Sequence, residues 1–167
     1  MTLKFVTLTA ITLGFLACST TRYSAPEPGA FQPPALQYAA FKGSSVAVRV
    51  LDHRGVREES EALVQSTRDA IVRSLKGAGI TLSKSAQASF EIRIVRYRAD
   101  FEMGNWTGCV RFQGIVETES EQRHELPVEK CVRKSNLWGG RSGDDAVQEA
   151  YSDALAELLS RVDQIRE

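Results

Sequence analysis

The sequence lacks a charge excess of either sign, since twenty-one Lys and Arg residues balance twenty-one Asp and Glu residues over 167 positions. Without a basic surplus the chain has no general attraction for polynucleotides, so nucleic-acid binding is not expected. The chain is also too short for two hydrophobic cores, which excludes a multidomain enzyme. A composition of 43% hydrophobic and 25% charged residues excludes wholesale disorder and a polytopic membrane protein.

Long apolar runs are missing as well, apart from one near the N-terminus. Residues 5–17 are apolar except for Thr and Gly, they follow a short segment that contains Lys4, and they end at Cys18. A membrane-spanning helix needs about 20 apolar residues, so this run is too short to cross a bilayer comfortably. The pattern therefore predicts a cleaved signal peptide.

The residues around the predicted cleavage site resemble the lipobox of bacterial lipoproteins. Ala17 is the small residue that precedes the modified cysteine, whereas Phe15 stands where leucine is usual. The resemblance implies that residues 1–17 are removed and that Cys18 receives acyl chains such as palmitate, and two or more chains anchor a protein durably. Ser19 is not the aspartate associated with inner-membrane retention, which favours the periplasmic face of the outer membrane. An ordinary signal with a coincidental cysteine is the alternative.

A Pro-rich segment follows the predicted lipidation site. Residues 18–43 contain four of the five prolines, together with Ser, Thr, Ala and Gln. This composition predicts a tether that lets the periplasmic domain, residues 44–167, stand off the bilayer. Residues 36–41 are apolar enough to dock on that domain.

Cysteines are few, and their number fits an exported protein. With Cys18 assigned to lipid, Cys109 and Cys131 remain as a pair that predicts a disulfide. They flank an alternating stretch whose midpoint is Ser120, and pairing position i with 240 minus i matches charges of opposite sign across a hairpin. Pro127 then suits an edge strand. Metal binding by the two thiols is the alternative, but with two histidines and no Cys-x-x-Cys spacing no metal site is expected.

The hydrophobic patterning predicts an α+β domain. Alternation predicts strands, and helical periodicity predicts helices, in the order strand 45–51, helix 58–76, strand 80–83, strand 90–98, hairpin 109–118 and 123–133, and helix 144–166. This order implies two layers, a mainly antiparallel sheet of four to five strands with two helices packed on one face. The opposite face is expected to be polar, carrying Arg93, Tyr97, Arg111, Glu117, Glu129 and Arg133.

This layout resembles that of YajG-type envelope lipoproteins and of LptE, the lipoprotein that plugs the lipopolysaccharide transporter. The resemblance rests on the lipobox, the tether, the strand of residues 46–50, the helix ending at residues 75–80, the strand of residues 90–94, the hairpin and the terminal helix. It covers residues 45–163 by order and pattern. It implies a fold and a location more than a role.

Two groups of residues are candidate partner contacts. Phe101 and Trp106 lie in a predicted loop, residues 100–108, close to the end of the hairpin that leads to Trp138, where aromatic side chains favour a partner or a glycan. Alternatively, the two tryptophans pack on the disulfide and seal the sheet end. Arg93 and Arg111 suggest a basic patch for lipopolysaccharide, peptidoglycan or an acidic protein surface, with a solvated, ion-paired face as the alternative.

No arrangement of residues predicts catalysis. The glycine-rich residues 138–143 lack the Gly-Lys-Ser/Thr ending of a nucleotide loop, and His53 is not accompanied by a nucleophile elbow. No catalytic residue and no cofactor are therefore expected. The sequence predicts a lipid-anchored envelope lipoprotein that acts as a non-catalytic binding or assembly module for an envelope protein or polymer. The alternatives are a lipopolysaccharide-transport accessory of LptE type and an envelope hydrolase.

Overall fold

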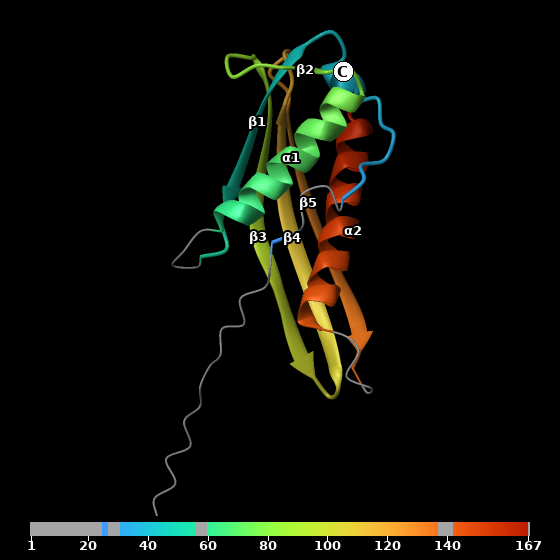
Figure 1. Ribbon diagram of the computed structural model, residues 1–167. Coiled ribbons are helices and arrows are strands. Elements are labelled where there is room, and N and C mark those ends of the chain that lie inside the picture. The colour runs from blue at the N-terminus through green and yellow to red at the C-terminus, as the bar shows by residue number, and fades with distance from the viewer. Residues whose placement is uncertain (1–24, 27–30, 56–59, 137–141, 167) are drawn as a thin grey trace, which may run out of the picture.

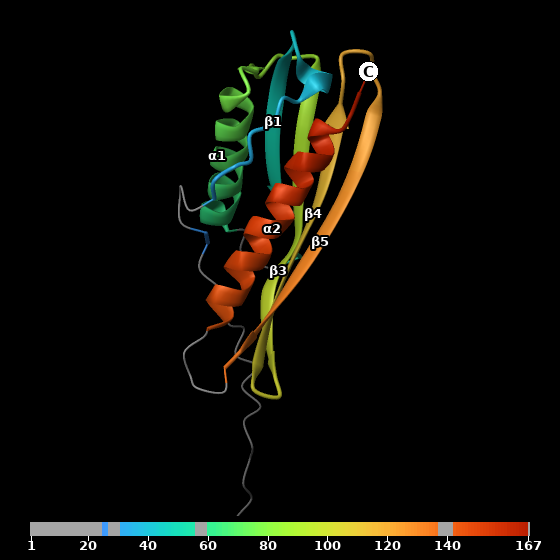
Figure 2. The same ribbon diagram turned by 90° about the vertical axis from the view of Figure 1, so that its right-hand side faces the viewer.

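The computed structural model describes residues 25–26, 31–55, 60–136 and 142–166, which form a five-stranded sheet with two helices on one face (Figure 1). The sheet order is β2-β1-β3-β4-β5, and α1 and α2 cover the same side of it in both views (Figure 2). The elements are η1 (Ala39–Phe41), β1 (Ser45–Asp52), α1 (Glu61–Gly77), β2 (Thr81–Leu82), β3 (Ala88–Glu102), β4 (Asn105–Glu117), β5 (Arg123–Ser135) and α2 (Gly143–Asp163). This is the two-layer α+β fold that the patterning predicts.

The sheet is mixed. Strands β3, β4 and β5 form a long antiparallel meander, whereas β1 pairs in parallel with β2 and with β3. A parallel connection needs a crossover, and α1 provides it between β1 and β2. The sequence pattern identified the strands, but it did not show that β1 lies inside the sheet between β2 and β3.

Both helices begin at side-chain caps. The Ser60 hydroxyl accepts the backbone N–H of Leu63 at 3.3 Å at the start of α1. In α2, Ser142 and Asp145 form a capping box, each side chain accepting the other residue's backbone N–H. These bonds satisfy N–H groups that have no partner within the helix.

The β4–β5 hairpin has the register that the sequence predicts. Cys109 pairs with Cys131, Arg111 with Glu129, and Gln113 with Pro127. The two cysteines form a disulfide with their Cα atoms 4.2 Å apart. Strand β5 is one of the two edge strands, so the missing N–H of Pro127 leaves no gap in the sheet.

The N-terminal segment contributes side chains to the core. Tyr38 and Phe41 are fully buried, as the apolar character of residues 36–41 suggested. The Tyr38 hydroxyl and the Ser74 hydroxyl of α1 share a buried hydrogen bond of 2.5 Å. Farther toward the N-terminus, Pro26 is buried and its carbonyl accepts the Ser66 hydroxyl at 2.9 Å. The chain is thus attached to α1 at Pro26 as well as at Tyr38.

A bulge in β3 reverses the predicted orientation of Tyr97. The register of β3 against β4 shifts between Ile94 and Arg96, which moves the alternation by one residue. The prediction that Tyr97 lies on the polar face is therefore wrong: its side chain is 5% exposed and meets the Tyr151 ring of α2 edge to face at 6.2 Å.

The loop expected over residues 100–108 is a continuation of the β3–β4 hairpin. The strands pair up to Glu102 and Asn105, leaving Met103 and Gly104 as the turn. Both turn residues have positive φ, 48° and 76°, as a two-residue hairpin turn of the primed type requires. The loop prediction is wrong because the alternation continues to the turn, which needs only one glycine.

Helix α2 lies unusually close to β4 because a glycine faces it. A Cβ atom on Gly108 would lie well within 3 Å of the backbone of Ala146 and Val147. Farther along β4, a Cβ on Gly114 would approach the Leu158 side chain at 2.7 Å. The absence of a side chain at Gly108 thus sets the distance between the N-terminal turn of α2 and the sheet.

Candidate functional site

The residues predicted as partner contacts lie on two separate surfaces. Phe101 and Trp106 are cross-strand neighbours whose ring centroids lie 4.9 Å apart, at the end of the β3–β4 hairpin. Arg93 and Arg111 lie farther along the sheet, on the face without helices, because their neighbours in β3 and β4 are buried in the core on the helix side. Trp138 lies outside the described residues. The structure therefore places the aromatic pair on one surface and the arginines on another, and the two do not form a single site.

We name the first surface the aromatic end, consisting of Phe101, Met103 and Trp106. The hairpin carries it past the first turn of α2, so no helix covers it (Figure 2). Met103 is 86% exposed and Phe101 is 53% exposed, whereas Trp106 is half-buried against the edge of the core. Two large apolar side chains, Phe101 and Met103, are thus exposed at the same end of the molecule.

The aromatic pair lies on the helix side of the sheet, away from the disulfide. Gly108 and Trp106 share a face with α2, and Cys109 points to the opposite face because neighbouring strand residues alternate. Trp106 therefore does not pack on the disulfide, which rules out that part of the packing alternative.

The second surface is the sheet face that no helix covers, which we name the open face. Its arginines are largely engaged: Arg93 contacts Glu91 at 2.7 Å, Arg96 contacts Glu129 at 2.6 Å, and further pairs are Arg98 with Asp100 and Arg123 with Glu117 and Glu125. Arg111 is exposed and, within the described residues, takes part in no ion pair. The open face is thus a mixed, partly neutralised surface and not a purely basic patch.

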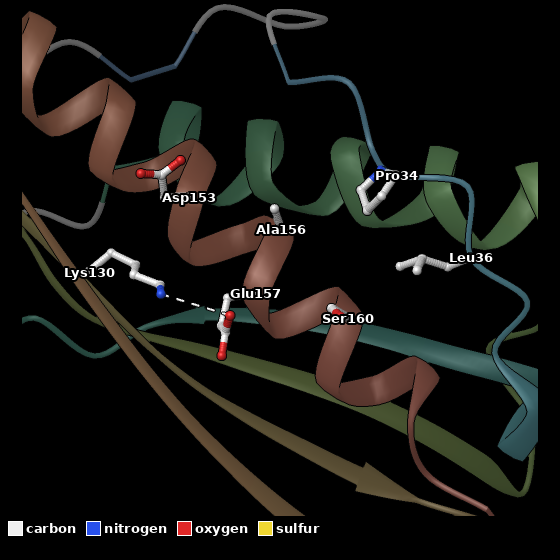
Figure 3. A pocket seen from close by; sticks show the side chains of 7 residues that line it. All are labelled: Pro34, Leu36, Lys130, Asp153, Ala156, Glu157 and Ser160. Atoms are coloured by element: carbon white, nitrogen blue, oxygen red, sulfur yellow. Dashed lines mark ion pairs between the residues drawn. The ribbon is translucent and has the colours of Figure 1, made fainter.

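A shallow depression of about 420 Å³ lies beside α2 (Figure 3). It is lined by Pro34 and Leu36 of the N-terminal segment, Lys130 of β5, and Asp153, Ala156, Glu157 and Ser160 of α2. Lys130 and Glu157 form an ion pair across it at 3.8 Å. Hydrogen bonding to Arg161 and the charge of Lys130 lower the pKa of Glu157, so its carboxyl group is ionised. No sequence signal marked this depression, because its lining comes from three distant segments.

Several buried hydroxyl groups of α1, α2 and the N-terminal segment are hydrogen-bonded. The Tyr151 hydroxyl donates to Thr67 Oγ1 at 3.1 Å, and Thr67 donates in turn to the Leu63 carbonyl at 2.8 Å. Burial raises the pKa of Tyr151 to about 12 and that of Tyr38 to about 12. These groups therefore stay neutral and stabilise the packing of α1 against α2 and the N-terminal segment.

Asp52, at the end of β1, makes contacts that stabilise the fold. Its side chain is 1% exposed and contacts Arg54 at 2.6 Å, and it accepts the backbone N–H of Ser60 at the start of α1. Burial alone would raise the pKa of Asp52, but the hydrogen bonds from Arg54 and Ser60 outweigh burial and lower it. His53 beside it is exposed, as expected for a solvated loop. Across the described residues, no cluster of three or more His, Cys, Asp or Glu side chains is arranged to hold a metal ion.

Comparison with known proteins shows the fold. No protein-family model and no curated protein matches the chain. It is similar to the solved structure of the hypothetical protein CT253 from Chlamydia trachomatis, with 12% identity and a TM-score of 0.53, over 72% of this chain and 96% of that one. The similarity establishes a shared architecture.

Weaker similarities also exist. One is to lipoprotein GNA1162 from Neisseria meningitidis, with 9% identity and a TM-score of 0.45 over 70% of this chain and 99% of that one. Another is to rare lipoprotein B from Shewanella oneidensis, with 8% identity and a TM-score of 0.42 over 70% and 89%. In the described part of the chain, neither helix is both long and apolar enough to cross a bilayer.

Proposed function

We propose that the protein is a lipoprotein anchored through Cys18 to the periplasmic face of the outer membrane, and that its α+β domain is a non-catalytic binding or assembly module. The observation that best supports this proposal is the placement of the three cysteines. One follows an apolar run and a small residue, as in a lipobox, and the other two are joined across the β4–β5 hairpin. A disulfide suits an oxidising, extracytoplasmic compartment.

The open face is the proposed binding surface for an envelope protein or polymer. It is an area of sheet without a helix layer (Figure 2), and it carries Arg93 of β3 and Arg111 of β4. Its mixture of arginines and glutamates favours a partner with complementary charges over a uniformly anionic polymer. Arg111 forms no ion pair with another described residue, because Glu129, which lies opposite it on β5, pairs with Arg96.

The lipid anchor is tested by purifying the protein from membranes and weighing its N-terminal peptide, with Cys18→Ala as the control. We expect acyl chains on Cys18 and loss of membrane association in the control. An unmodified peptide that begins elsewhere would refute the anchor.

The binding role is tested by crosslinking in cells followed by affinity purification and mass spectrometry. Capture of one stoichiometric envelope protein, reduced by Arg111→Glu but not by the matched change Arg68→Glu on α1, would support an assembly module. If that partner were an integral barrel of the lipopolysaccharide transporter, the LptE-type role would be favoured. Equal capture by both variants would refute the open face as the contact.

A further inference from the structure

We propose that the aromatic end of the β3–β4 hairpin inserts into the interface of the same leaflet that holds the acyl chains, so that the domain has two membrane contacts. This inference rests on the proposed lipidation of Cys18. It assigns Phe101, Met103 and Trp106 to lipid and leaves the open face for the envelope partner.

The segment that joins the lipidated Cys18 to the folded domain is short. Pro26 is held to Ser66 of α1 by its carbonyl, and Ala25 packs against the core. Cys18, the start of the mature chain, and Ala25 are seven positions apart, so seven peptide units join them. Even when fully extended they span at most about 25 Å, so the domain remains close to the bilayer.

The aromatic end lies near the limit of the distance that residues 18–25 can span from the docked segment. Asp52 pairs with Ile94 of β3, and its carboxylate also accepts the N–H of Ser60 at the start of α1. From Ile94 the strand continues to Glu102, a length of about 26 Å. Helix α1 runs from that level toward the other end of the sheet (Figure 1), and Ser66, which binds the Pro26 carbonyl, lies about 9 Å along it. A fully extended segment of residues 18–25 that runs along the molecule therefore places the lipid within about 10 Å of the level of the aromatic end.

The two ends of the sheet differ in chemistry, and this selects the end that faces the lipid. The β3–β4 turn exposes Met103 and Phe101. At the opposite end, the β4–β5 turn exposes Glu119, Ser120 and Glu121, which water solvates well and lipid does not. An aromatic and apolar tip with polar flanks is the type of surface that settles at the boundary of headgroups and acyl chains.

Charge does not drive this contact. Near the aromatic end, Arg98 is paired with Asp100, and Lys134 is paired with Glu149 of α2. Arg133 and Glu102 add one charge of each sign. Insertion should therefore depend on apolar burial and not on anionic lipid or on low salt.

The fluorescence of Trp106 can be used to measure insertion of the aromatic end. The chain has two tryptophans, so Trp138→Phe leaves Trp106 as the only one. The mature, lipidated variant is reconstituted into vesicles of phosphatidylethanolamine and phosphatidylglycerol, with or without bromine on the acyl chains. We expect strong quenching of Trp106 emission by brominated lipid, equal at low and high salt and with phosphatidylcholine in place of phosphatidylglycerol.

Variants separate insertion from simple proximity. Phe101→Ser with Met103→Ser should lower the inserted fraction about tenfold, since it removes most of the apolar area of the tip. Leu51→Ser, a matched change at an exposed apolar residue of the open face, should leave quenching unchanged. If the acylated protein shows no quenching, or if quenching requires anionic lipid, the inference is overturned while the anchor stands. A peptide without acyl chains on Cys18 overturns both.

Discussion

Replacing Gly108 by alanine should destabilise the domain severely, although alanine is normally preferred to glycine within a strand. The added Cβ would collide with the backbone of Ala146 and Val147 at the start of α2, where no side-chain rotation relieves the overlap. Overpacking of this kind costs up to about 3 kcal/mol in a well-packed core. Because the clash is with helix backbone, we expect Gly108→Ala to lie at the upper end, near 3 kcal/mol.

Two other glycines provide graded controls. At Gly114 the added Cβ meets the end of the Leu158 side chain at 2.7 Å, which can move, so we expect a loss of about 1 kcal/mol. At Gly77, in the last turn of α1, nothing lies within 4 Å, and alanine should be neutral or stabilising by up to about 0.5 kcal/mol. Urea unfolding of the oxidised proteins, compared at equal m-values, gives the three free-energy differences. A Gly108→Ala protein within about 0.5 kcal/mol of wild type would refute the close contact of α2 with β4.

Three further predictions concern the disulfide and the buried titratable groups. Replacing both Cys109 and Cys131 by serine opens a loop of 22 residues and should lower the free energy of unfolding by about 3 kcal/mol, measured by chemical denaturation. An unchanged denaturation midpoint would contradict a stabilising role of the disulfide. The pKa of Asp52 is lowered in the folded protein, so its stabilising contribution is present above its ordinary pKa of 3.8 and is lost as the pH falls below that value. The free energy of unfolding should therefore fall less steeply with acid in Asp52→Asn than in the wild type, and parallel curves would argue against the contacts of Asp52 with Arg54 and Ser60. The pKa of Tyr151 is raised to about 12, so its contribution to stability is present below pH 10 and is lost as the pH rises toward 12. Tyr151→Phe should lower the free energy of unfolding by about 1 kcal/mol at neutral pH, but in thermal melts it should lose less stability than the wild type as the pH rises. Equal alkaline losses in the two proteins would refute the burial of the Tyr151 hydroxyl as the cause.

Local patterns identified the hairpin register because they act over neighbouring residues. The spacing of Cys109 and Cys131, together with the matching of Arg111 to Glu129, fixes the pairing of β4 and β5 through side chains that face one another. The α2 capping box was likewise visible, since Ser142 and Asp145 are three residues apart. Such features need no knowledge of the rest of the fold.

The candidate contacts were found as residue types but not as surfaces. Phe101 and Trp106 were recognisable as aromatic residues near a turn, and their pairing depends on strands that extend to Met103 and Gly104. The separation of this pair from Arg93 and Arg111 follows from which side of the sheet each residue occupies. That assignment requires the position of the helices, which no local pattern contains.

The sequence by itself determined the pairing of Cys109 with Cys131, the alternation of the strands and the start of α2, because each depends on local patterns of residues. Only the tertiary structure decided that β1 lies between β2 and β3, and that the N-terminal segment joins the core. It also decided that Tyr97 faces α2, since one extra residue in β3 shifts the alternation that follows. Strand order and docking depend on packing between distant segments, and the free energy of that packing is not encoded in any short stretch of sequence.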